Sequence, residues 1–547
     1  MTDVRVRIAP SPTGPVHVGT AYQALFDLVL AKKHGGKFVL RIEDTDQTRF
    51  VKGAQDYILD SFKWCGITPD EGPGIGGEYG PYIQSERKEI YHEYAQILID
   101  TEKAYYAFDT SDELTKMRDE AKKMGMPNWQ YNSITRNSMK NSLTLSKEEV
   151  ENRFSKNESC AIRIKMPRNE DIRFYDEIRG WVVVNTNNMG DKVIFKADGM
   201  PTYHLANVVD DYLMDISHVI RGEEWLPSAP LHVLLYRYLE WESVMPKFAH
   251  LPLILKPDGN GKLSKRDGDR LGFPVFPLEW TDPKSKEISS GYREKGYFSE
   301  SFVNMLAFLG WNPGSSKELF TMDELIKEFS LERVGKSGAK FDPEKAKWFN
   351  QRHLRNKSNS ELSSLMLENC KYDVGNEYLE KVAELMKERA TFHHDLLSED
   401  YFFKSENDDD FTNSIEGSFA SDGESDDGNQ NVNIVFKSSM INLDNEKEEK
   451  KESSEDDYYA IQDALEDINE IDDDIAFDVN KAVNEAFNID DEINVLQDVD
   501  APQTTDDDIV DNKKVDESSN QKEEKIPYDT SKQRMNILIL YPDDWRH

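Results

Sequence analysis

The order of elements at the N-terminus constrains the fold of this chain more than any other feature. Residues 5–9 alternate polar and apolar side chains, as a short strand does, and prolines and glycines interrupt the pattern after Pro10. Residues 20–30 carry apolar side chains at helical spacing, and Lys37–Ile42 has the composition of a second strand. A strand, a helix and a strand of these lengths are the unit of a parallel α/β sheet. The sequence therefore predicts an α/β fold.

Two short segments, far apart in the chain, carry groups that suit the two ends of a nucleotide triphosphate. In SPTGPVHVGT (Ser11–Thr20), His17 and Gly19 lie at the predicted helix entrance, where unpaired N–H groups attract phosphate. His17 can donate a hydrogen bond, and Gly19 has no Cβ to block a base or ribose. GKLSKR (Gly261–Arg266) offers lysines that could neutralise charge on a leaving pyrophosphate. Each segment alone also fits an ordinary surface loop.

Five segments together resemble the bacterial-type glutamyl-tRNA synthetases, which are class I aminoacyl-tRNA synthetases. In chain order they are RIAPSPTGPVHVGTAYQALF, RIEDTD, YHLANVVDD (Tyr203–Asp211), VIRGEEWL (Val219–Leu226) and KLSKR. The resemblance covers roughly Met1 to Phe403 and departs from many class I enzymes at Thr20, where those have histidine. It implies a Rossmann-type catalytic domain with an inserted acceptor-binding domain, followed by α-helical stem-contact and partial anticodon-binding domains.

The resemblance also implies domain boundaries. The catalytic domain would comprise residues 1–100 and 189–280, interrupted by an acceptor-binding insertion at residues 101–188. A stem-contact helical domain would follow at 281–345, a partial anticodon-binding bundle at 346–404, an acidic, mostly disordered region at 405–534 and a sulfatase-like strand at 535–547. Because the family normally continues through a second helical bundle, we expect the last part of the anticodon-binding region to be missing.

The activity that the resemblance implies is that of a glutamate–tRNA ligase. L-glutamate and ATP would form glutamyl-adenylate, and the glutamyl group would then pass to the 3′ end of tRNA(Glu). Such a reaction needs alignment and charge stabilisation more than proton transfer. The implied catalytic residues are His17, Lys262 and Lys265. The implied ATP-binding residues are His17, Gly19, Glu224, Trp225, Lys262, Ser264 and Lys265.

The glutamate site that the resemblance implies is built around arginine, whose planar fork binds both oxygens of a carboxylate. Its residues are Arg7, Ser11, Glu43, Tyr203, Asn207 and Arg221. Arg7 would bind the side-chain carboxylate with Arg221 nearby, and Glu43 would bind the α-ammonium group. Glutamine would leave a buried guanidinium unmatched, so a glutaminyl-tRNA synthetase is disfavoured. Arg5, on the same strand, fits a surface ion pair.

Metal and RNA ligands are harder to place. We expect Mg²⁺ to accompany ATP, and no structural zinc, because residues 101–160 contain a single cysteine and zinc needs closely spaced Cys and His. Arg163, Lys165 and Arg168 are candidate RNA contacts, or simply exposed basic residues at a strand edge. The three scattered cysteines, Cys65, Cys160 and Cys370, indicate reduced buried thiols.

A formal charge of −37 disfavours RNA as a partner when it is spread evenly, but in this chain the charge is unevenly distributed. Residues 405–534 contain 40 acidic and 11 basic residues, whereas residues 1–404 contain 62 and 55. We expect residues 405–534 to be mostly disordered, with either acidic amphipathic helices or a solvated linker at Asp457–Val499. Met535–Trp545 resembles the opening strand of a sulfatase and would have no sheet to join. A truncated, fused reading frame or a chance apolar segment would explain it.

The N-terminus has no secretory signal pattern and no apolar run could span a bilayer, so we expect a cytoplasmic monomer without membrane contact. Two other functions stay open. A short tRNA-modifying paralogue would end soon after the KLSKR loop, whereas this chain continues with helical patterns. A non-catalytic acidic interaction protein would not need Arg7, His17, Glu43 and Lys265.

Overall fold

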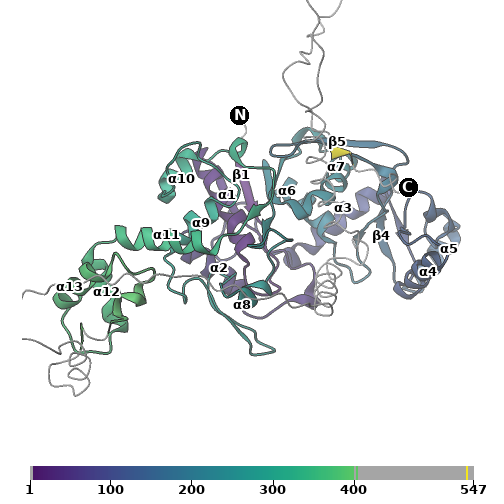
Figure 1. Cartoon of the computed structure of the whole chain (residues 1–547). Helices are drawn as coiled ribbons and strands as arrows, with labels where there is room; N and C mark the ends of the chain where they lie inside the picture. The colour runs from purple at the N-terminus through teal and green to yellow at the C-terminus, as the bar shows by residue number, and fades with distance from the viewer. Residues whose placement is uncertain (1–3, 400–401, 404–537, 540–547) are drawn as a thin grey trace, which may run out of the picture. The chain divides into compact units, whose positions relative to one another are not determined.

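The computed structural model describes residues 4–399, 402–403 and 538–539 (Figure 1). The chain forms two compact units, divided between Asn350 and Gln351, and residues 538–539 belong to the first. The expectations for residues 405–534, including the amphipathic stretch at 457–499, lie outside the described residues.

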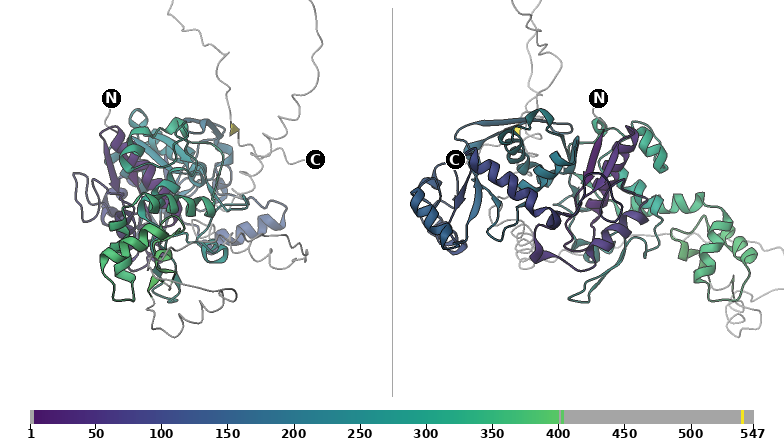
Figure 2. Two further views of the ribbon diagram at one scale, coloured as in Figure 1. Left: turned by 60° about the vertical axis from the view of Figure 1, so that its left-hand side comes forward. Right: turned by 180° about the vertical axis from the view of Figure 1, so that it is seen from behind.

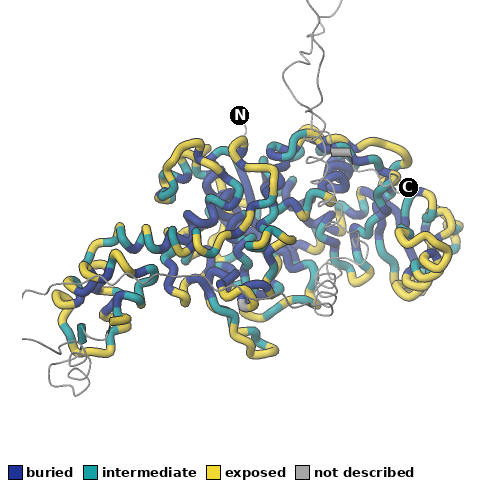
Figure 3. Tube along the Cα trace, in the orientation of Figure 1, coloured by how far each residue is buried: buried dark blue, intermediate teal, exposed yellow. Residues whose placement is uncertain are grey.

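The predicted strand–helix–strand unit is confirmed. Strand β1 (Arg5–Ile8) pairs in parallel with β2 (Lys37–Leu40), and helix α1 (Val18–Lys33) connects them. The three elements lie together in both views of Figure 2. Figure 3 shows that α1 is buried along most of its length, which agrees with its apolar composition. The helix begins at Val18, slightly before the predicted start, because His17 caps it.

The parallel arrangement extends beyond these strands. The Ser217 N–H donates to the Arg5 carbonyl at 2.8 Å, which places the start of β8 (His218–Gly222) beside β1. Strand β8 pairs in parallel with β9 (Lys247–Leu251), and β9 pairs in parallel with the end of β5 (Asp171–Asp176). Strand β6 (Gly180–Asn185) then pairs antiparallel with β5. Helices α6 (Tyr203–Leu213) and α7 (Ala229–Tyr238) contribute apolar side chains to the shared core.

A three-stranded antiparallel sheet extends beyond the segment expected to be an insertion. It is formed by β3 (Ala104–Ala107) and β4 (Ala161–Ile164), which lie within residues 101–188, and by β7 (Val193–Phe195), which follows them. Helices α4 (Ser111–Lys123) and α5 (Lys147–Ser155) lie within the same segment, and α3 (Lys88–Asp100) precedes it.

One predicted RNA contact in this segment is wrong. The Arg163 side chain is buried, its guanidinium lies 4.2 Å from the ring centre of Tyr131, and it donates to the Asp191 carbonyl. Arg168 is exposed and Lys165 is half-buried, so these two remain accessible.

The first unit also contains α2 (Ala54–Trp64), β10 (Ile254–Leu255), α8 (Asp267–Leu271), β11 (Trp280–Thr281), β12 (Ile288–Ser289), α9 (Ser299–Ala307), α10 (Met322–Glu328) and β13 (Ala339–Lys340). The division between the two units falls within α11 (Pro343–Asn356). The second unit contains α12 (Asn359–Asn369) and α13 (Asn376–Met386), which pack together as a helical pair.

The C-terminal strand differs from expectation. Strand β14 (Leu538–Ile539) pairs in parallel with β6, with Leu538 opposite Val182 and Ile539 opposite Val183. The expectation that this segment would have no sheet to join is therefore wrong for these two residues. A sheet edge offers unpaired N–H and C=O groups that any extended apolar segment can use.

The three cysteines are free thiols, but only Cys65 is buried, while Cys160 and Cys370 are half-buried. The prediction of buried thiols is thus correct for Cys65 alone. No helix within the described ranges combines the length and the apolar character that a membrane span requires.

Candidate active site

The entrance of α1 presents His17 as a neutral hydrogen-bond donor. Its Nδ1 accepts the Gly19 N–H at 3.1 Å, which leaves the ring proton of the neutral imidazole on Nε2. Burial and the nearby charges of Lys262 and Lys265 lower the pKa of His17 to about 3. Nε2 is buried and has no hydrogen-bond partner among the described residues. A Cβ at Gly19 would lie 3.3 Å from the same Nδ1, so this position favours glycine for the cap itself.

The structure brings the two nucleotide-binding segments together. A Cβ built on Gly14 would lie 3.6 Å from Lys265 Nζ, so the second lysine of KLSKR reaches the proline- and glycine-rich loop before α1. Lys262 Nζ lies 2.8 Å from Glu224 Oε1, and both side chains are more than a third exposed. Gly259 and Gly261 have φ values of +83° and +82°, so the turn before the lysines depends on glycine.

An unpredicted residue, Asp267, anchors the lysine loop. It accepts hydrogen bonds from the backbone N–H and the hydroxyl of Ser264 at 2.8 and 2.6 Å. It also forms ion pairs with Arg270 at 2.8 Å and with Lys256 at 3.4 Å. The predicted ATP ligand Ser264 therefore already uses its hydroxyl within the loop. An acidic residue directly after a basic motif was the sequence signal for this contact.

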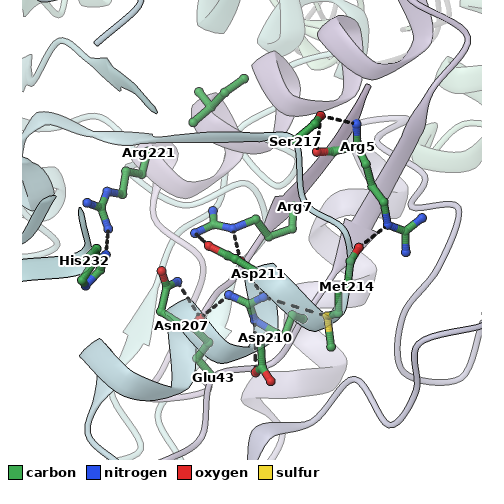
Figure 4. Close-up of polar contacts among 12 residues, drawn as sticks. Arg5, Arg7, Glu43, Asn207, Asp210, Asp211, Met214, Ser217, Arg221 and His232 are labelled. Atoms are coloured by element: carbon green, nitrogen blue, oxygen red, sulfur yellow. Dashed lines mark hydrogen bonds and ion pairs between the residues drawn. The ribbon is translucent and has the colours of Figure 1, made fainter. Parts of the chain in front are cut away.

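The core of the first unit contains a buried network of charged side chains (Figure 4). Arg7 Nε and Nη2 contact the two carboxylate oxygens of Asp211 at 2.9 and 3.2 Å. Arg41 Nη1 lies 2.7 Å from the same carboxylate, and Arg41 Nη2 lies 2.9 Å from Glu43. The two arginines hold the pKa of Asp211 below its usual value although burial opposes this. Arg7 is thus matched by an acidic partner from α6, which the sequence analysis did not foresee.

Helix α6 carries two further predicted residues into this network. Asn207 Nδ2 donates to Glu43 at 3.3 Å, and the Tyr203 hydroxyl accepts from Arg221 Nη1 at 2.7 Å. The ring of Trp225 lies 4.6 Å from that of Tyr203, measured between centroids. These contacts place Glu43, Asn207, Tyr203 and Arg221, four of the residues expected around glutamate, in one region, together with Trp225, which was expected at the ATP end.

The contacts of Arg221 differ from those of Arg7, because its partners are neutral. Besides Tyr203, it contacts His250 Nε2 through Nε at 3.0 Å and His232 Nδ1 through Nη1 at 3.3 Å. Burial lowers the pKa of both histidines, and that of His250 to about 4. Arg221 Nη2 is buried and has no hydrogen-bond partner in the described part of the chain.

Two predicted residues lie apart from the network. Ser11 is exposed in the loop before α1, where its carbonyl accepts the Thr13 N–H at 2.9 Å. Arg5 is not a surface residue: it is buried, and its Nη1 and Nη2 lie 2.7 and 2.6 Å from the carboxylate of Glu71. The expected ion pair exists, but it is part of the core.

The sequence patterns did not indicate roles for Arg41, Asp211, His232 and His250, although Arg41 and Asp211 lie within the motifs RIEDTD and YHLANVVDD. The available signal was an acidic pair, Asp210–Asp211, directly after the apolar residues Val208 and Val209 in α6. Charged residues on a buried helix face need partners, and such partners identify a polar centre in the core.

Comparison with known proteins agrees with this architecture. Residues 3–348 match the family described as tRNA synthetases class I (E and Q), catalytic domain. A glutamate–tRNA ligase of Cytophaga hutchinsonii is 57% identical over 405 residues, covering 73% of this chain and 78% of the relative. That of Amoebophilus asiaticus is 56% identical over 403 residues, covering 73% of this chain and 79% of the relative.

Solved structures give the same result. A glutamate tRNA ligase from Elizabethkingia meningosepticum, in complex with its amino acid, is 50% identical with a TM-score of 0.72 and covers 75% of this chain and 83% of its own. A glutamate-tRNA synthetase from Elizabethkingia anophelis is 51% identical with a TM-score of 0.71 and covers 75% of this chain and 84% of its own. The chain therefore belongs to the class I tRNA synthetases of the glutamate and glutamine group.

Proposed function

We propose that this chain is a glutamate–tRNA ligase, which activates L-glutamate with ATP and transfers it to the 3′ end of tRNA(Glu). The curated relatives at 54–57% identity that carry this activity in their names support the proposal. One structural observation carries the choice of an acidic substrate: Arg221 is buried, has neutral partners and keeps Nη2 unpartnered among the described residues. A buried cation of this kind favours a carboxylate ligand.

We assign the glutamate end to the polar centre of the core. Arg221 and Arg7 provide positive charge for the side-chain carboxylate, and Tyr203 and Asn207 line the same region. Glu43 binds the α-ammonium group, together with Ser11 from the loop before α1. Glutamine is rejected because its neutral amide would leave the arginine charge unmatched in a buried site.

We assign the ATP end to the entrance of α1 and the lysine loop. His17 donates through Nε2 to a phosphate oxygen, and Gly19 allows close approach of the nucleotide. Glu224 and Trp225 border the adenosine, while Lys262, Ser264 and Lys265 face the phosphates. His17, Lys262 and Lys265 are the catalytic residues in this assignment, with Lys265 nearest to the loop before α1.

The first step forms a bond between a glutamate α-carboxylate oxygen and the α-phosphorus and breaks the bond to pyrophosphate. Lys262 and Lys265 neutralise the charge that moves onto pyrophosphate, and His17 holds the phosphate chain in line. In the second step a terminal hydroxyl of tRNA attacks the activated carbonyl and AMP leaves. Within the described ranges no cluster of three or more His, Cys, Asp or Glu side chains could hold a metal ion. We assign Mg²⁺ to the phosphates of ATP and to water, because this ion usually binds with substrate phosphates and keeps several waters.

We assign binding of the tRNA acceptor end to residues 101–188, where Arg168 and Lys165 remain accessible. Residues 281–345 and 346–404 are assigned to the stem contact and to part of the anticodon-binding region. We further propose that the enzyme acts as a monomer in the cytoplasm. These assignments follow the family pattern and the nearly balanced charge of residues 1–404.

Glutamate-dependent ATP consumption, measured with and without tRNA(Glu), tests the proposal. We expect ATP to be consumed with glutamate but not with glutamine, and glutamate to become attached to tRNA(Glu). Glutamylation of a tRNA base instead of the 3′ end would identify the modifying paralogue. No glutamate-dependent consumption under any condition would favour a non-catalytic role.

A further inference from the structure

Arg221 donates hydrogen bonds through all of its N–H groups except those on Nη2. Its Nε–H reaches His250, and Nη1 reaches both Tyr203 and His232. A guanidinium has five N–H groups in a rigid plane, so fixing Nε and Nη1 also fixes the direction of Nη2. The position of this arginine therefore depends on whether its neutral partners present lone pairs and not N–H groups.

The sheet places His250 and Asp176 behind Arg221. Arg221 and His250 are opposite each other in the parallel pairing of β8 with β9, and Asp176 ends β5 opposite Phe248 of β9. His250 Nδ1 lies 2.6 Å from Asp176 Oδ2, and both side chains are fully buried. The Asp176 carboxylate also accepts backbone N–H groups from Ile178 at 3.0 Å, Arg179 at 2.8 Å and His250 at 3.1 Å.

This arrangement fixes the tautomer of His250. Asp176 is held by three backbone donors and can only accept from Nδ1, so the imidazole proton lies on Nδ1. Nε2 then carries a lone pair, which the Arg221 Nε–H requires as its acceptor. Burial and the nearby Arg221 lower the pKa of His250 to about 4, so the ring stays neutral near pH 7. The opposite tautomer would set two N–H groups against each other.

We propose that Asp176 and His250 are positioning residues that aim Arg221 Nη2 at the carboxylate of the acidic substrate. This inference rests on the proposed function and adds two residues to it. Neither residue touches the substrate in this arrangement. They act by holding a buried guanidinium in one orientation, which is the condition for distinguishing a carboxylate from an amide.

Replacement of His250 tests the proposal by separating glutamate binding from ATP binding. In ATP–pyrophosphate exchange with tRNA(Glu) present, His250→Leu should raise the KM for glutamate about tenfold or more, as expected for loss of a hydrogen bond to a charged group. The KM for ATP should change by less than about twofold, because the substitution affects only the glutamate end of the site. His250→Gln, whose Oε1 can take the place of Nε2, should recover most of the loss. His218→Gln, a matched control on β8, should behave as the wild type does.

The assay of the wild-type protein distinguishes failure of the proposed function from failure of the positioning role. A wild-type protein that does not activate glutamate contradicts the proposed function. A wild type that does so, beside a His250→Leu variant that folds with an unchanged KM for glutamate, overturns the positioning role. A variant with a lower unfolding temperature and unchanged KM values would mark a purely structural role and also overturns it.

The tautomer gives a second readout that depends neither on activity nor on the stability of His250→Leu. Nitrogen-15 NMR of histidine-labelled protein distinguishes the two neutral tautomers, and the His250→Gln spectrum identifies one signal pair among the 11 histidines. We expect the proton of His250 on Nδ1 in the wild type, and its loss from that position in Asp176→Asn. A wild-type proton on Nε2 would overturn the proposal whatever the kinetics show.

Discussion

The two ends of the candidate active site are built on opposite principles. The glutamate end is buried, and in the core Arg7 and Arg41 lie 2.9 and 2.7 Å from the carboxylate of Asp211. The ATP end contains a glycine-dependent turn followed by Lys262, which pairs with Glu224. The side chains of Lys262 and Glu224 are each more than a third exposed. Selection of a small acidic substrate needs charges that cannot move, because a misplaced buried charge costs several kcal/mol. A loop that neutralises a leaving pyrophosphate needs long side chains that can extend to it, and solvent screens the charges of these side chains while they are exposed.

This contrast predicts that core substitutions lower both stability and activity, whereas loop substitutions lower activity alone. The largest effect should come from Arg7→Ala. It removes one of the two cations at Asp211, and breaking a buried pair costs roughly 3–5 kcal/mol of the free energy of unfolding. Glutamate activation should fall by about two orders of magnitude or more. Urea denaturation and pyrophosphate exchange measure the two effects.

Arg173→Ala is the control for this substitution, because the Arg173 side chain is 66% exposed and pairs only across the surface with Asp171. It should change the free energy of unfolding by less than about 1 kcal/mol. Near-normal glutamate activation by Arg7→Ala would show that the pocket has been assigned to the wrong residues.

The second effect should come from Lys265→Ala. Loss of a group that stabilises charge in the transition state should slow adenylate formation by about a hundredfold or more. The KM for glutamate and the unfolding midpoint should hardly change, because the loop contributes little to the core. Lys284→Ala, at an exposed position in the turn between β11 and β12, is the control. A large rise in the KM for glutamate at unchanged turnover would contradict the role of Lys265.

Lowering the pH should reduce the stability of the protein through the buried histidines at the glutamate end. Burial lowers the pKa of His204 to about 3, below that of the unfolded chain. The unfolded state therefore takes up this proton first, and stability falls as the pH drops from about 6.5 towards 3. The slope is at most ~1.4 kcal/mol per pH unit for one histidine.

The variant His204→Asn removes that contribution, so its free energy of unfolding should vary less between pH 7 and 5. Urea denaturation at several pH values measures the difference. The control is His92→Asn, since His92 is exposed. An equal pH dependence in wild type and His204→Asn would show that His204 is not kept neutral by the fold.

The smallest effect on stability should follow deletion of residues 405–547. These residues carry most of the net negative charge, which repels RNA phosphates within a Debye length of roughly 10 Å at 0.1 M salt. Their described contact with the core is the two-residue pairing of β14 with β6. The unfolding midpoint should hardly move, and tRNA binding at low salt should improve. If the deletion unfolded the protein or abolished tRNA binding, residues 405–547 would be a functional domain.

The sequence predicted the elements whose signals are local. Apolar spacing and the glycines and prolines located β1, α1 and β2, and the lysine motif located the loop that meets Gly14. It failed where burial depends on distant residues. Arg5 and Arg163 were expected at the surface, but Glu71 and Tyr131 enclose them in the core. A charged residue in a strand gives no local sign of which side of the sheet is covered.

The sequence by itself determined the α/β fold class, the family resemblance and the residue types of the two motifs, because these depend on local pattern and order. Only the tertiary structure decided which arginine is matched by an acid and which is not. Asp211 is 204 residues from Arg7, and Asp176 is 74 residues from His250. Hydrogen bonds depend on distances of a few tenths of an ångström. Strand register and helix packing set those distances, and neither can be read from residue spacing along the chain.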